Sequence, residues 1–187
     1  MINLENIRLR AIESSDSRFY YNWVNNAETN QWRGLYPPTS EAAAQKWVDD
    51  QAATTMTAEI SDRFSLAVEI GPDTGCFEHV GFIGLRGICS RSRRAELWIY
   101  LGDKWAWNKG VGKEAVRGLC QFAFEEMNLH RLWLECDPEH QGGVRCYQKA
   151  GFVEEGRLRQ AYFRRGQFRD TIMMGLLKPD WEARKTR

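Results

Sequence analysis

The sequence lacks the features that would place it among membrane, secreted or repeat proteins. Its 187 residues contain no run of roughly 18 apolar residues, the length that a membrane span requires. Residues 1–12 alternate apolar and charged side chains, without the basic-then-apolar order of a signal peptide. No internal repeat or low-complexity segment interrupts the chain. We therefore expect one domain over residues 1–187, in the cytoplasm and without a membrane partner.

Cysteine and histidine are present, but in no pattern that predicts disulfides or a metal site. The five cysteines form no C-x-x-C pair, which favours a reducing compartment, and we interpret all five as packing residues. His79 and His130 are isolated, so no metal site is expected. The formal net charge is +1, which gives no general attraction for nucleic acid. A nucleic-acid partner is therefore not expected.

What the sequence does contain is a succession of segments with the periods of strands and helices. Period-two alternation predicts strands at residues 7–12, 64–70, 79–88, 94–101, 132–136, 152–163 and 168–177. Helical spacing predicts a helix between Asp16 and Asn25, and further helices at residues 41–53, 111–127 and 142–150. This order of elements indicates a mixed α+β domain.

The most informative segment is the loop between the strand predicted at residues 94–101 and the helix that follows it. Residues 107–112 read Trp-Asn-Lys-Gly-Val-Gly. A loop that enters a helix N-terminus points backbone N–H groups outward at the positive end of the helix dipole, so a diphosphate can accept hydrogen bonds there. Glycine permits a close approach and a positive φ angle, and Lys109 and Lys113 add positive charge. Taken alone, glycines in a turn indicate ordinary loop geometry more often than phosphate binding.

The elements on either side of this loop make nearly the whole chain resemble a known family. The order strand, K-G-x-G, amphipathic helix, strand, followed by Y-x-K-x-G-F at residues 147–152, resembles the GNAT superfamily of acetyl-CoA-dependent acetyltransferases. The runs I-R-L-R at residues 7–10 and G-Q-F-R-D at residues 166–170 are similar to its RimJ/RimL-type branch. The resemblance implies a GNAT-like mixed sheet of about seven strands, flanked by helices and splayed between its fourth and fifth strands. It also implies acetyl-CoA as co-substrate.

The resemblance implies which residues bind the cofactor. In the family a Q/R-x-x-G-x-G/A segment holds the pyrophosphate, and here Trp107 stands in the first position instead of a polar residue. Backbone N–H groups at the splay are implied to hold the thioester carbonyl. His140 stands where many relatives have an asparagine that bonds the pantetheine arm; it can donate a similar bond or be a solvated loop residue. The implied set is Ile99, Tyr100, Leu101, Trp107, Asn108, Lys109, Gly110, Val111, Gly112, Lys113, His140 and Lys149.

Acetyl transfer to an amine requires an uncharged nucleophile, a stabilised oxyanion and a proton for the departing thiolate. The resemblance implies that Tyr147 is the general acid toward the coenzyme A thiolate; the alternative is a core tyrosine with a satisfied hydroxyl. Glu96, on the strand before the loop and beside aromatic residues, is the candidate base acting through water. An ion pair of Glu96 with Arg93, Arg94 or Arg131 explains this residue equally well.

The sequence identifies the acceptor only as a primary amine. RimJ/RimL-type relatives acetylate protein N-termini, polyamines, amino sugars or small amines, so the resemblance implies a small-molecule amine or a peptide N-terminus. Residues 32–38 contain no acidic residue, although polyamine-acetylating relatives place acidic residues there, which disfavours a polyamine. The aromatic residues that suit a partly apolar or sugar-like acceptor are Trp23, Trp32, Tyr36 and Trp47.

Several alternatives stay open from the sequence. The arginines at positions 157, 159, 164, 165 and 169 are interpreted as a solvated edge, with adenosine 3′-phosphate or an acidic acceptor as alternative ligands. A polyamine acetyltransferase of the spermidine type, and an acyl-CoA-binding sensor without turnover, are the other functions that we consider. A homodimer is one assembly that fits the expected domain.

Overall fold

The structure is a computed structural model that describes residues 1–32, 38–53, 62–71 and 76–185. None of the helices in these ranges combines the length and the apolarity needed to cross a membrane. The strands are β1 (Ile2–Asn3), β2 (Ile7–Arg10), β3 (Arg63–Ile70), β4 (Glu78–Cys89), β5 (Arg94–Leu101), β6 (Arg131–Cys136), β7 (Val153–Arg164) and β8 (Gln167–Leu177). The helices are the short η1 (Ser14–Asp16) and η2 (Lys104–Ala106), together with α1 (Ser17–Val24), α2 (Glu41–Ala52), α3 (Val111–Glu125), α4 (Gln141–Ala150) and α5 (Lys178–Lys185).

In the described residues the strands form one eight-stranded sheet in the order β1-β2-β3-β4-β5-β6-β8-β7. Neighbouring strands are antiparallel except for the parallel pair β5 and β6. The predicted α+β fold is confirmed, with four elements that were not predicted: the two-residue β1, the short helices η1 and η2, and the helix α5. Helix α5 gives little periodic signal because Trp181 is its buried residue and its other side chains are mostly polar.

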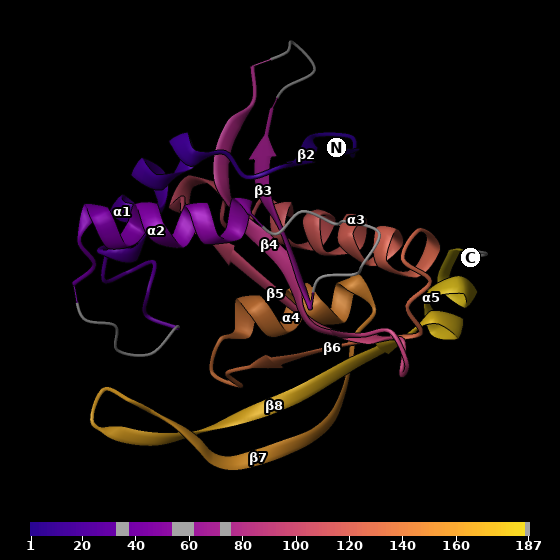
Figure 1. The fold of residues 1–187 in the computed structure, drawn as a ribbon. Helices are drawn as coiled ribbons and strands as arrows, with labels where there is room; N and C mark the ends of the chain where they lie inside the picture. The colour runs from indigo at the N-terminus through magenta and orange to yellow at the C-terminus, as the bar shows by residue number, and fades with distance from the viewer. Residues whose placement is uncertain (33–37, 54–61, 72–75, 186–187) are drawn as a thin grey trace.

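Helices cover both faces of the sheet (Figure 1). On one face α1 and α2 pack over an aromatic cluster that includes Trp23, Phe82 and Tyr100. On the other face α3 packs against a larger aliphatic core that contains Leu97 of β5. Alternate residues of β5 therefore face the two layers, as the period-two pattern predicted.

The sheet opens between β5 and β6, the fourth and fifth of the strands predicted from the sequence. Their pairing runs from Arg94 opposite Arg131 to Glu96 opposite Trp133, although both strands continue beyond it. Gly102 donates its N–H to the carbonyl of Val80 in the neighbouring chain segment, at 3.0 Å. Because successive residues of a strand alternate in the direction of their backbone groups, the N–H groups of residues 99 and 101 face β6. The predicted splay is confirmed, and it leaves strand backbone directed into a gap.

The five cysteines are free thiols in different environments. Cys120 and Cys136 are buried and Cys89 and Cys146 are half-buried, in agreement with a packing role. Cys76 is exposed, so the interpretation of all five as packing residues is wrong for Cys76. Periodicity could not show this, because Cys76 lies in the connection before β4, outside any strand or helix.

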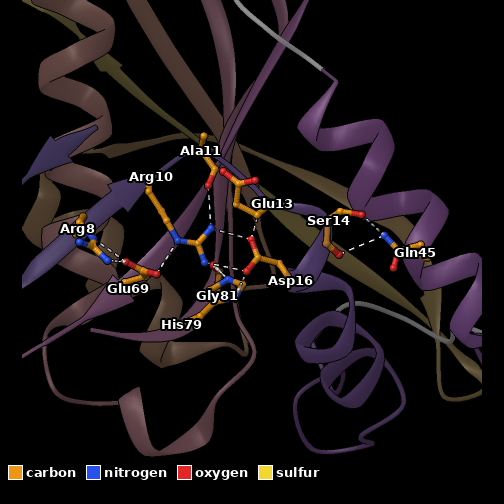
Figure 2. A network of polar contacts seen from close by, with 10 residues as sticks. All are labelled: Arg8, Arg10, Ala11, Glu13, Ser14, Asp16, Gln45, Glu69, His79 and Gly81. Carbon is orange, nitrogen blue, oxygen red and sulfur yellow. Dashed lines mark hydrogen bonds and ion pairs between the residues drawn. The ribbon is translucent and has the colours of Figure 1, made fainter. Parts of the chain in front are cut away.

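A buried network of hydrogen bonds and ion pairs connects η1 to the first strands (Figure 2). Arg10 donates two hydrogen bonds of 2.8 Å to the two carboxylate oxygens of Asp16 and a third, of 2.6 Å, to Glu69. Arg8 donates to the other oxygen of Glu69 at 2.6 Å. Nδ1 of His79 lies 3.2 Å from Oδ1 of Asp16. The sequence had shown no partner for this histidine. The network joins β2, β3, β4 and η1.

Acid is expected to weaken this network. Burial raises the pKa of Asp16, but hydrogen bonds from Arg10 and His79 outweigh burial and hold the pKa well below the ordinary value of 3.8. Burial likewise raises the pKa of Glu69, and bonds from Arg10 and Arg8 bring it below 4.5. Because both folded-state pKa values are lowered, the stabilisation is complete above the ordinary values and is lost as the pH falls through the folded-state values.

The measurement is urea unfolding as a function of pH, on the wild type and on Asp16→Asn. The wild type should be the more stable protein at pH 7, and the difference in unfolding free energy should shrink from about pH 5 to about pH 2. A difference that stays constant over this range would show that the carboxylate charge of Asp16 contributes nothing.

Candidate active site

The loop before α3 reaches the helix through two residues with left-handed backbone. Asn108 has φ of 60° and Gly110, the N-cap of α3, has φ of 86°. A Cβ placed on Gly110 would meet nothing closer than 3.9 Å, so this position requires glycine for its φ angle rather than for space. Glu114 donates its N–H to the carbonyl of Gly110 at 3.1 Å. The backbone N–H groups of residues 111–113 lie before this first helical hydrogen bond, so they have no acceptor within the helix. N–H groups at a helix start can donate to a bound anion.

Two predicted cofactor-binding side chains are engaged within the protein. The Trp107 indole N–H donates to the carbonyl of Leu101 at 2.9 Å, and its backbone N–H donates to Lys104 at 3.0 Å. Trp107 therefore ties the loop to the end of β5. The Lys109 ammonium lies 4.5 Å from the centroid of the Trp105 ring. An anion at this loop would accordingly be held chiefly by backbone N–H groups.

Helix α4 brings Tyr147 to the beginning of α3. A Cβ on Gly112 would lie 3.2 Å from the Cys146 sulfur, so the glycine allows the two helices to approach. Tyr147 packs edge-to-face on Phe152, with ring centroids 6.2 Å apart. In the described part of the chain no protein group forms a hydrogen bond with the Tyr147 hydroxyl. Burial, followed by the nearby Cys136 and Cys146, raises its pKa well above the ordinary range, so the hydroxyl carries its proton at neutral pH.

Glu96 forms an ion pair with an arginine that the sequence did not indicate. The partner is Arg86 of β4, which lies directly opposite Glu96 in the β4–β5 register. Arg131, one of the arginines considered from the sequence, instead pairs with Glu155. The expected partners of Glu96 were wrong because cross-strand pairing, rather than proximity in the chain, sets its neighbour.

His140 is stacked and half-buried rather than solvated. Its ring lies nearly parallel to that of Trp32, with centroids 4.8 Å apart and an interplanar angle of 11°. A Cβ on Gly143 would lie 2.6 Å from His140 Nδ1, so the ring covers the first turn of α4. Burial, and then Arg164, lower the pKa of His140 although Asp137 raises it. Its solvated alternative is wrong; its bond to pantetheine stays a prediction, as does the role of Lys149, which is exposed in the last turn of α4.

The described aromatic residues proposed for the acceptor are divided, because Trp23 and Trp47 belong to one aromatic cluster on the α1–α2 side whereas Trp32 stacks on His140. Trp23 is 7% exposed and belongs to the core, where a Cβ on Gly102 would lie 2.0 Å from its ring. Trp47 stacks on Tyr20 with centroids 4.0 Å apart. Tyr36 and the rest of residues 33–37, on which the argument about acidic residues rested, lie outside the described residues.

A buried charged cluster beside His140 was not predicted as part of the site. Asp137, just beyond β6, pairs with Arg164 at 2.5 Å and accepts a hydrogen bond from the Tyr162 hydroxyl. Arg164 and Tyr162 lie at the end of β7, and the Arg164 guanidinium lies 5.0 Å from the centroid of the Trp32 ring. The sequence singled out Arg164 among the arginines of the last hairpin, but the interpretation as a solvated edge is wrong for this residue because its side chain is buried against Asp137.

Replacing Gly110 by alanine is expected to weaken acetyl-CoA binding about tenfold. A left-handed backbone costs a residue with a Cβ roughly 1–2 kcal/mol, and relief of that strain would redirect the amides at the start of α3. Calorimetry with acetyl-CoA measures the effect. Gly87→Ala is the matched control, because Gly87 has φ of 58° and equally open space but lies at the far end of β4. Equal loss of affinity in both variants would contradict the assignment.

Comparisons with known proteins agree with this architecture. The family model described as the acetyltransferase (GNAT) domain matches residues 6–153. The uncharacterized N-acetyltransferase p20 of Bacillus licheniformis is 27% identical over 177 residues, covering 95% of this chain and 96% of p20. The spermidine N(1)-acetyltransferase of Escherichia coli K12 is 25% identical over 189 residues, covering 98% of this chain and 92% of that enzyme.

A solved structure shows the same fold. Spermidine N-acetyltransferase from Vibrio cholerae, in complex with CoA and spermine, superposes with a TM-score of 0.80 at 24% sequence identity, covering 95% of this chain and 98% of that one. The family match, the splayed sheet and the glycine-containing start of α3 point to the same cofactor chemistry. The chain belongs to the GNAT family and is an acetyl-CoA-dependent N-acetyltransferase.

Proposed function

We propose that this protein transfers the acetyl group of acetyl-CoA directly to a primary amine, with Tyr147 as the proton donor to the departing thiolate. The observation that carries the proposal is the position of Tyr147 on α4, the helix that packs against the start of α3. The Tyr147 hydroxyl is held protonated by burial and has no hydrogen-bond partner among the described residues. A proton donor in this position suits a leaving group held between the two helices.

The remaining parts of the site supply binding and charge stabilisation. Backbone amides of residues 108–113 bind the pyrophosphate, and the N–H groups of Ile99 and Leu101 in the β5–β6 gap donate to the thioester oxygen as it gains negative charge. The backbone of Tyr100 is paired with Phe82 of β4, so Tyr100 contributes through its side chain on the acceptor face.

The acceptor amine must lose protons during the reaction, and we assign the role of base to Glu96. The amine enters as an ammonium and must lose a proton before its lone pair attacks the acyl carbon. Glu96 accepts that proton through water, the new C–N bond forms, the C–S bond breaks, and Tyr147 protonates the sulfur. The second proton that the nitrogen loses as it becomes an amide returns to the Tyr147 oxygen through water. The Arg86 ion pair keeps the Glu96 carboxylate in place on β5.

A polyamine acetyltransferase is the second candidate, favoured by the names of the relatives from Escherichia coli and Vibrio cholerae. A polycation needs free carboxylates, and three of the described carboxylates on the surrounding elements are ion-paired, whereas Glu135 of β6 is exposed. Glu96 pairs with Arg86, Asp137 with Arg164 and Glu28 with Lys104. We therefore rank a less cationic amine first, the range of acceptors that the RimJ/RimL-type resemblance implied.

The experiment combines calorimetry with acetyl-CoA and a thiol-release assay over amines of different classes. Acetyl-CoA binding together with thiol release that depends on an added amine is the expected result. Binding without thiol release on any amine would overturn the proposal in favour of an acyl-CoA sensor.

A further inference from the structure

Strand β4 contains a β-bulge where it runs beside the end of β5. Two consecutive residues of β3, Val68 and Glu69, lie opposite Gly81 and His79 respectively. Val80 is therefore an extra residue on β4, between the two that are paired. A bulge of this kind bends its strand and can end the pairing with a neighbour, and bulges are frequent next to active sites.

The bulge holds the end of β5 in place. The Val80 carbonyl accepts the N–H of Gly102 at 3.0 Å and the N–H of Asp103 at 3.2 Å. Two consecutive N–H groups directed at one carbonyl turn the chain out of the sheet, and β5 ends at Leu101. Gly81 lies opposite Leu101, and a Cβ on Gly81 would lie 2.9 Å from the Leu101 Cα. Only glycine therefore lets β4 pack this closely against the residue whose N–H faces β6.

The His79 ring bonds to the backbone of this bulge (Figure 2). Nε2 lies 2.8 Å from the carbonyl oxygen of Gly81. Because a carbonyl only accepts, Nε2 is the donor. On the other side of the ring, Nδ1 lies 3.2 Å from Oδ1 of Asp16, and the His79 side chain is 3% exposed. Asp16 is itself held in place, because Arg10 donates to both of its carboxylate oxygens.

Aromatic rings pack on the His79 ring and extend its contacts to β5. Phe19, Trp23 and Phe82 meet it edge-to-face, with centroids 5.1, 5.1 and 4.8 Å from that of His79. The Trp23 ring also lies on the backbone that follows β5, because a Cβ on Gly102 would be 2.0 Å from it. His79 is thus connected to the end of β5 by the backbone of the bulge and by the ring of Trp23.

We propose that His79 is a positioning residue for acetyl transfer, a role that rests on the proposed function. By holding the Gly81 carbonyl, His79 fixes the bulge and therefore the place at which β5 ends. The N–H of Leu101 is then directed at the thioester oxygen. A donor stabilises an oxyanion most when it is aimed in advance at the place where the charge develops. His79 acts on the reaction through the backbone of Gly81 and Leu101.

The test uses two substitutions of His79 that differ in reach. In His79→Gln the side-chain nitrogen is as many bonds from Cα as Nε2 is, so a donor to Gly81 is retained. In His79→Asn the nitrogen is only as many bonds away as Nδ1, so a polar group faces Asp16 but the bond to Gly81 is lost. Each protein is saturated with acetyl-CoA that carries an isotope label at the thioester carbonyl, and isotope-edited infrared spectroscopy measures the carbonyl stretch.

Hydrogen bonds in the β5–β6 gap should move the stretch of the bound carbonyl below that of free acetyl-CoA. His79→Asn should lose at least half of this displacement, whereas His79→Gln should keep most of it. In thiol release with the fastest of spermidine, glucosamine and a tripeptide amide, kcat should fall about tenfold in His79→Asn, part of the loss that removal of an oxyanion donor causes. The Kd for acetyl-CoA should change by less than about twofold, because the interaction is made in the transition state.

Leu176→Ala is the control for a general loss of stability. Leu176 is buried in β8 and lies opposite Leu132, which pairs with Ala95 at the closed end of the β5–β6 pairing. Its truncation leaves a cavity in the core but should not move the carbonyl stretch. A loss of displacement in Leu176→Ala or in His79→Gln as large as that in His79→Asn would overturn the positioning role.

The other outcomes separate this proposal from the proposed function. An unchanged stretch in a folded His79→Asn protein overturns the role of His79 while the acetyltransferase proposal stands. A wild-type stretch equal to that of free acetyl-CoA overturns the oxyanion role of Ile99 and Leu101, and the role of His79 with it. Thiol release with none of the amines overturns the proposed function itself. If thermal melting shows that His79→Asn does not fold, His79→Phe, which keeps a ring among the three aromatic neighbours, takes its place with the same expected loss.

Discussion

Tyr147→Phe is expected to lower kcat by about 10²–10⁴-fold, the range that general acid catalysis contributes, while the Kd for acetyl-CoA changes little. The hydroxyl matters mainly as negative charge develops on the sulfur, so its loss removes an interaction of the transition state rather than of the ground state. The ring of Tyr147 packs on Phe152, and phenylalanine preserves this contact. Thiol release gives kcat, and calorimetry gives the Kd.

Tyr21→Phe is the control, because it removes a hydroxyl from α1, remote in sequence from α4 and the start of α3. It should leave both constants unchanged. If Tyr147→Phe raised the Kd by as much as it lowered kcat, the hydroxyl would have a binding role. An unchanged kcat would remove Tyr147 from the acid role, and the thiolate would then take its proton from water.

Asp16→Ala is expected to lower the free energy of unfolding by about 3–5 kcal/mol, the cost of breaking a buried ion pair by removing one partner. The Asp16 side chain is 3% exposed and holds both Arg10 and His79. Without it, the Arg10 guanidinium stays in a largely buried position with Glu69 as its carboxylate partner. Urea unfolding at pH 7 measures the difference.

The control for this prediction is Glu28→Ala. Glu28 also forms an ion pair, with Lys104, but its side chain is 64% exposed, and exposed pairs contribute at most about 1 kcal/mol. A loss of less than about 1 kcal/mol in Asp16→Ala would show that the network of Figure 2 is no more stabilising than a surface pair.

Most of the helices and strands, and the loop proposed to hold the cofactor, could be predicted from the sequence alone. Alternation along β5 and helical spacing along α3 depend on neighbours within a few residues, so they are readable from the chain. The same holds for Gly110, whose φ of 86° is a local requirement of the turn into α3. Elements such as β1 and α5 were not predicted because they are short or bury few residues, and therefore show only weak periodicity in the sequence.

Which charged and aromatic side chains meet could not be predicted from the sequence, because it depends on the three-dimensional packing of the elements. Glu96 faces Arg86 because of the β4–β5 register, and Trp23 enters the core although its residue type suited an acceptor surface. Trp32, His140 and Arg164 come from three distant parts of the chain. Their contacts depend on how residues 29–32, α4 and the end of β7 pack together. Periodicity in the sequence reports neighbours along a strand or helix, whereas these contacts join residues from across the fold.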